Sequence, residues 1–256
     1  MPSRHGRFSV GTHGATVSGV EVVALLGAVF VAALTQVTVG FGFALLAVPL
    51  MTLALDTHEA VVISTMLGLV TSGFQAWHGR AEIDRPLVKR LMVAALLGIP
   101  VGVIVFQQVD ERVLKMLLGV SVLIAVVVLA TGIASKGSTT TDVLCGALSG
   151  ALAASLSTNG PPLVFALQTR GLPMSVFRPT INTVFTLSGV ASLVAFVVGG
   201  DVERAAVGHA LLAVPVMLVG SRIGFLLRRR VPETGARRLV LTLLVVAAVS
   251  AIVSAI

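Results

Sequence analysis

Two short segments, 36–43 and 157–163, combine helix-breaking residues with polar side chains inside otherwise apolar sequence. We expect a new helix to start after each break, around Phe41 and Pro161, because glycine frees the backbone and proline fits a first helical position. The first N–H groups of a helix lack partners within that helix and carry the positive end of its dipole. Two such helix starts facing one point would form an anion site without a buried lysine or arginine.

The candidate binding residues come from these two segments and from a later helix predicted near 176–198. Arg178 opens that helix, and Asn182 lies one turn deeper on the same face, where the pair could receive an anion moving between the site and the cytoplasm. A charged membrane anchor plus an interhelical hydrogen bond explains this pair equally well. The candidate set is Gln36, Thr38, Gly40, Phe41, Gly42, Phe43, Thr158, Asn159, Gly160, Pro161, Pro162, Arg178 and Asn182.

Catalytic chemistry has little support in the sequence. No Asp or Glu lies near the middle of a full-length apolar segment, so there is no evident carboxylate proton relay. The chain lacks a G-x-x-x-x-G-K-[ST] phosphate loop, and His58-Glu59 has no second histidine four residues on. We therefore predict a protein that is not an enzyme, with no catalytic residues, no metal and no cofactor.

Composition identifies the elements that must position the candidate residues. The 256 residues are 56% hydrophobic and only 11% charged, against about a quarter charged in soluble domains. Apolar runs of about 20 residues, enough to cross a bilayer, predict an all-α integral membrane protein in contact with lipid. A net charge of +7 is expected in cytoplasmic loops, so no nucleic-acid partner is predicted. The predicted full-length spans are 59–78, 87–106, 112–131, 179–199, 205–227 and 237–255.

The second half of the chain matches the first at an offset of about 120 residues. The first tip, TVGFG at 38–42, falls on TNGPP at 158–162, and the matched loops carry opposite charge. This pattern predicts two inverted repeats of about five segments each, with short paired or re-entrant helices at the start of each repeat and both termini outside. The predicted divisions are a polar N-terminal segment at 1–19 without a cleaved signal peptide, repeats at 20–131 and 142–256, and a linker at 132–141.

The residues around both tips resemble the sulfite exporter TauE/SafE family. The likeness rests on TVGFGFALLAVPL at 38–50, the helix start at Glu59, NGPPLV at 159–164 and FRPT at 177–180, and it extends over about 22–256. It implies a multi-pass protein of the bacterial inner membrane that transports small sulfur-containing anions such as sulfite or organosulfonates. Phe41 and Phe43 could form an apolar side of the site, which suits an organosulfonate.

The leading interpretation is a secondary transporter that binds its anion at the membrane midplane between two helix starts. A carrier of small carboxylates is the alternative, since helix starts favour any compact anion. A membrane-embedded enzyme or an accessory subunit is a different class, and it lacks the expected cluster of titratable residues. The exact anion, the transport direction, the coupling ion and the oligomeric state stay open.

Overall fold

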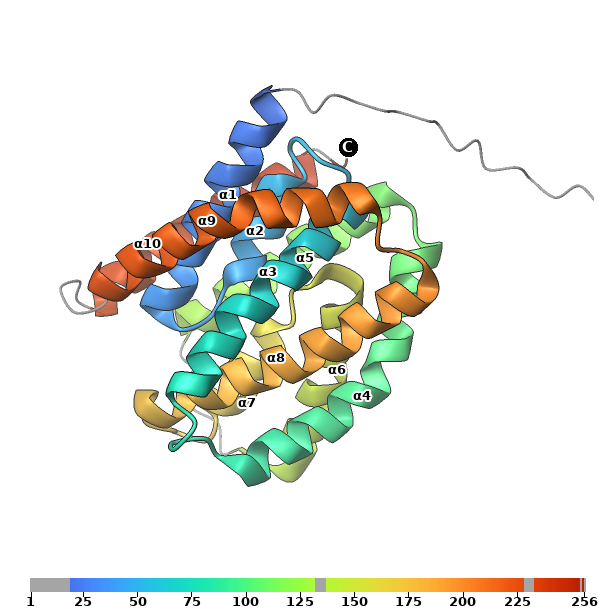
Figure 1. Cartoon of the computed structure of the whole chain (residues 1–256). Coiled ribbons are helices and arrows are strands. Elements are labelled where there is room, and N and C mark those ends of the chain that lie inside the picture. The colour runs from blue at the N-terminus through green and yellow to red at the C-terminus, as the bar shows by residue number, and fades with distance from the viewer. Residues whose placement is uncertain (1–18, 132–136, 228–232, 254, 256) are drawn as a thin grey trace, which may run out of the picture.

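The computed structural model describes residues 19–131, 137–227, 233–253 and 255, and these form ten helices (Figure 1). Six of them are long and apolar enough to cross a membrane: α1, α3, α4, α5, α8 and α9. The prediction of a multi-pass helical membrane protein is therefore confirmed. The helices are α1 (Gly19–Val39), α2 (Phe43–Met51), α3 (Thr57–His78), α4 (Arg85–Gln108), α5 (Glu111–Thr131), α6 (Thr139–Leu156), α7 (Gly160–Gln168), α8 (Met174–Gly199), α9 (Arg204–Leu227) and α10 (Glu233–Val253).

The helices at the start of each predicted repeat differ in length from the expectation. Only the second member of each pair is short, since α2 and α7 have nine residues each. The first member is long, with 21 residues in α1 and 18 in α6. No proline interrupts either helix, so each runs unbroken to its glycine- or asparagine-containing tip.

Several boundaries also move. Helix α2 starts at Phe43 rather than near Phe41, because Gly40 and Gly42 have φ values of 107° and 105°, which no right-handed helix accepts. Helix α6 starts within the predicted linker, because the Ser138 hydroxyl accepts a hydrogen bond from the Thr141 amide and caps it. Residues 132–136 of that linker and 1–18 of the N-terminal segment lie outside the described residues.

The two sets of five helices, α1–α5 and α6–α10, make corresponding contacts. Helix α4 packs on α6 as α9 packs on α1, while α3 pairs with α8 and α5 with α10. Helices α3 and α8 run antiparallel, since Gly73 lies beside Thr186 whereas Gly189 lies beside Leu69. If each helix of the first set is replaced by its counterpart in the second set, and the reverse, these same pairs of helices remain in contact.

Glycines allow the closest of these helix pairs to approach. In α4, a side chain at Gly98 or Gly102 would overlap the backbone of α6 at Ala147 and Ala151. In α9, a Cβ at Gly224 would lie 2.7 Å from the Leu34 carbonyl oxygen of α1. These glycines therefore permit the close packing of α4 on α6 and of α9 on α1.

One end of the bundle, here called the basic end, brings together the loops 79–84, 137–138 and 169–173. Asp142 is fully buried there and forms ion pairs with Arg170 at 2.5 Å and with Arg90 at 3.5 Å. The Asp84 amide donates to the Thr180 hydroxyl at 3.0 Å, which ties the start of α4 to α8. Basic residues outnumber acidic ones here: Arg80, Arg85, Lys89, Arg90 and Arg170 against Glu82, Asp84 and Asp142.

The opposite end, here called the acidic end, brings together the loops 52–56, 109–110 and 200–203. Glu59 of α3 and His209 of α9 pair at 2.6 Å, and Gln107 donates to Asp201 at 2.8 Å. Acidic residues outnumber arginines and lysines at this end: Asp56, Glu59, Asp110, Glu111, Asp201 and Glu203 against Arg112, Lys115 and Arg204. The ends thus differ in charge, and the two tips lie between them.

Candidate functional site

A cavity lies between the two tips, here called the tip cavity. The volume of this cavity is about 50 Å³. This is enough for a few waters at roughly 10–15 Å³ each or for one compact ion. The first turn of α2 lies close to the second tip, because a Cβ at Gly160 would lie 3.3 Å from the Leu45 side chain. The cavity is lined by Gln36, Gly42, Phe43, Ala44, Leu45, Ser64, Thr65, Gly68, Ser72, Ala153, Ser157, Thr158, Asn159, Gly160, Phe185 and Gly189.

Gln36 shapes the first tip, and its side chain is buried. Its Oε1 accepts a hydrogen bond from the Phe43 amide at 2.7 Å, which caps the start of α2. Its Nε2 donates to Ser72 Oγ at 3.0 Å and to Asn182 Oδ1 at 3.1 Å. One side chain therefore joins the tip to α3 in the first half and to α8 in the second half.

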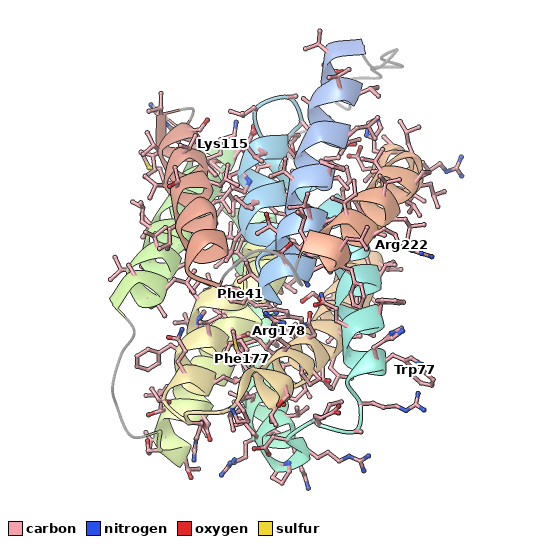
Figure 2. The ribbon with its side chains drawn as sticks, turned by 90° about the vertical axis from the view of Figure 1, so that its left-hand side faces the viewer. Phe41, Trp77, Lys115, Phe177, Arg178 and Arg222 are labelled. Atoms are coloured by element: carbon pink, nitrogen blue, oxygen red, sulfur yellow. The ribbon has the colours of Figure 1, made fainter. Side chains whose placement is uncertain are left out.

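Asn182 and Arg178 hold the other side of the same tip. Asn182 Nδ2 donates to the Gly40 carbonyl at 2.7 Å, and Arg178 Nη2 donates to the Thr38 carbonyl at 3.4 Å. Gly40 is required here, since a Cβ would lie 2.7 Å from Arg178 Cγ and the φ of 107° disfavours other residues. Figure 2 shows Arg178 near the centre of the bundle, close to Phe41 and Phe177, whose ring centroids are 6.4 Å apart.

The second tip is held by hydroxyl and amide contacts. Ser157 ends α6 in the left-handed conformation with φ 57°, and its Oγ accepts from Thr65 of α3 at 3.1 Å. Asn159 Nδ2 donates to Ser188 of α8 at 2.9 Å. Helices α3 and α8 thus support both tips.

The structure divides the predicted site residues into three groups. Gln36, Gly42, Phe43, Thr158, Asn159 and Gly160 line the tip cavity. Gly40 and Phe41 belong to the first tip but contact α8 instead of the cavity, and Arg178 and Asn182 of α8 hold the tip in place.

Thr38, Pro161 and Pro162 form the third group and do not line the cavity. The Thr38 hydroxyl donates to the Leu34 carbonyl within its own helix at 2.7 Å. The two prolines line a separate apolar cavity of about 430 Å³ between α4, α5, α6 and α7.

The first turns of α2 and α7 differ in what they offer a ligand. The amides of Ala44 and Leu45 lie in the first turn of α2 and have no acceptor within the helix. In α7, Pro161 and Pro162 carry no N–H, so Gly160 is the only residue among the first three that has one. The positive pole of the cavity therefore lies mainly at α2.

Sequence reasoning missed the contribution of α3 and α8 to the cavity. Ser64, Gly68 and Ser72 line it from α3 at spacings of four residues, which places them on one helix face. Phe185 and Gly189 line it from α8 with the same spacing. A stripe of small and hydroxyl residues along 64–72 was the available signal.

Among the described residues, the lining has no charged side chain and no histidine, so it offers hydrogen-bond donors and apolar walls rather than acid or base groups. Neutral donors beside a helix N-terminus are the kind of group that can hydrogen-bond a compact anion.

Comparison with known proteins identifies the family of the chain. The chain is 24% identical over 198 residues, 74% of its length and 77% of the relative, to a protein of Cupriavidus necator named "Probable sulfite/organosulfonate exporter TauE". No solved structure matches. The family model described as "Sulfite exporter TauE/SafE" matches residues 25–251. The chain therefore belongs to the sulfite exporter TauE/SafE family, a family of membrane transporters and not of enzymes.

Proposed function

We propose that this transporter moves sulfite or a small organosulfonate and binds it in the tip cavity. The observation that carries the proposal is the cavity itself, where the first turn of α2 meets the second tip among neutral donors. The aromatic rings of Phe43 and Phe185 line the same space and suit the apolar part of an organosulfonate. The relative from Cupriavidus necator carries sulfite and organosulfonate in its name. A small carboxylate is the alternative ligand, since helix N-termini favour any compact anion.

A binding screen on detergent-purified protein tests the ligand class. We expect sulfite or an aryl sulfonate to raise the melting temperature, because a ligand that binds only the folded state stabilises it by mass action. A carboxylate of matched size and chloride are the controls. Stabilisation by the carboxylate alone would favour the alternative, and no selective effect of any anion would overturn the site.

We further propose that the two sets of helices are inverted repeats, with the basic end in the cytoplasm of a bacterial cell and both termini outside. The antiparallel pairing of α3 with α8 supports an axis of repetition that lies in the membrane plane. The charge difference between the ends supports the orientation, because arginine and lysine gather on the cytoplasmic side. The cavity would then lie where the halves meet, and rocking of one half against the other would open it to each side in turn.

Cysteine labelling tests this topology. Glu82 lies in the loop at the basic end and Glu203 in the loop at the acidic end. In a Cys145→Ala background, a membrane-impermeant thiol reagent added to intact cells should label Glu203→Cys and leave Glu82→Cys unlabelled. Opening the cells should expose both, which controls for buried positions. Labelling of both residues in intact cells would contradict the inverted arrangement.

A further inference from the structure

Ser64 of α3 is a polar residue that lines the tip cavity. It is fully buried on α3, and its hydroxyl has no hydrogen-bond partner among the described residues. A buried hydroxyl without a partner costs about 1–3 kcal/mol. Ser64 is one of the residues that line the cavity, so a ligand bound there is a candidate acceptor for its hydrogen bond.

Two other serines provide an internal comparison. Within the same described ranges, Ser149 of α6 and Ser192 of α8 are also fully buried with hydroxyls that have no partner. Neither lines the tip cavity nor the apolar cavity behind Pro161 and Pro162. Burial without a partner therefore recurs in this bundle, but of these three serines only Ser64 is also a residue of the cavity lining.

The charge of the lining limits what the cavity can hold. Every residue that lines it in the described part of the chain has a neutral side chain, and the first-turn amides of α2 are neutral dipoles as well. The cost of removing an ion from water grows with the square of its charge, whereas its attraction to neutral dipoles grows only in proportion to the charge. With a lining of this kind, a doubly charged anion is disfavoured relative to a singly charged one of equal size.

We propose that Ser64 Oγ and the amides of Ala44 and Leu45 form a neutral donor set that binds a singly charged oxyanion and rejects a doubly charged one. This inference rests on the proposed function and adds to it the charge state of the ligand and a residue that contacts it. Ser64 donates directly to a ligand oxygen, and the first turn of α2 supplies the positive dipole end.

Methanesulfonate and sulfate test the proposal as a matched pair. Both are fully ionised at neutral pH and similar in size and shape, but the first carries one charge and the second carries two. Binding to the purified full chain would be followed by calorimetry and by thermal shift at constant ionic strength. We expect methanesulfonate to bind at least tenfold more tightly than sulfate.

Substitution isolates the contribution of the hydroxyl. Ser64→Ala should weaken methanesulfonate binding about tenfold or more, because a hydrogen bond to a charged group is lost. The melting temperature of the ligand-free variant should be unchanged or higher, because the substitution breaks no hydrogen bond to the described residues. Ser149→Ala and Ser192→Ala are the matched controls and should leave binding unchanged. If Ser64→Ala does not fold, Ser64→Cys keeps the shape with a weaker donor and should weaken binding in the same direction.

The outcomes separate the two proposals. Equal affinity for sulfate and methanesulfonate would overturn charge selection, and unchanged binding in the Ser64 variants would overturn the role of the hydroxyl. Both results leave the proposed function standing. Failure of every anion, including sulfite and sulfonates, to bind the wild-type protein would overturn the proposed function itself.

Discussion

Gly98→Val is expected to prevent the bundle from assembling. Any Cβ at Gly98 would overlap the carbonyl of Ala147, and the neighbouring Gly102 meets Ala151 in the same way. Both obstacles are backbone atoms of α6, so no side chain can rotate away to make room. Overpacking typically costs 1–3 kcal/mol, and we expect roughly 3 kcal/mol or more here because the α4–α6 contact would have to open along its length.

The matched control is Gly208→Val, the same substitution in another membrane-spanning helix. Gly208 lies on α9, and no atom of the described neighbouring residues lies within 4 Å of the place that a Cβ would take, so this variant should fold. The measurement is the yield of monodisperse protein in detergent and its melting temperature. A Gly98→Val protein as abundant and as stable as Gly208→Val would show that α4 and α6 are not in backbone contact.

Five of the six spans could be predicted because hydropathy reports directly on the length of an apolar run, whereas α1 was expected to be a short segment and 237–255 was expected to be a span. The tips could be predicted because Gly40, Gly42, Pro161 and Pro162 break helices by local backbone chemistry. The start of α2 was misplaced by two residues, since it depends on the Gln36 side chain that caps Phe43, whereas the start of α7 at Gly160 lies next to the predicted Pro161.

The cavity lining was harder to predict, because its partners are distant in sequence. Gln36 and Asn182 are 146 residues apart, and no local pattern reports their hydrogen bond. Ser64 and Ser72 look like residues that pack helices in a membrane, and their place in the cavity lining is evident only once α3 is placed against both tips. Thr38 was predicted as a binding residue because it lies at a tip. Its hydroxyl instead donates to the Leu34 carbonyl of its own helix.

Asn182→Leu is expected to abolish anion binding and transport while leaving the bundle assembled. The asparagine is fully buried, donates to the Gly40 carbonyl and accepts from Gln36 and Gln75. Leucine has a similar volume but removes these contacts and leaves buried polar groups without partners, at about 1–3 kcal/mol each. Two buried groups without partners correspond to roughly 30-fold or more in affinity for the anion. The affinity falls because the first tip relaxes away from its ligand-binding shape.

Thr183→Val is the control on the same helix, because the Thr183 hydroxyl bonds to the Pro179 carbonyl within α8. Uptake or efflux in proteoliposomes and a binding titration should fail for Asn182→Leu and persist for Thr183→Val, with both variants eluting as folded protein. The tip is a small part of the bundle, and α3 and α8 still pack along the rest of their length, so the damage stays local. Wild-type binding by Asn182→Leu would mean that the shape of the first tip does not depend on α8, and the coupling between the two halves would have to lie elsewhere.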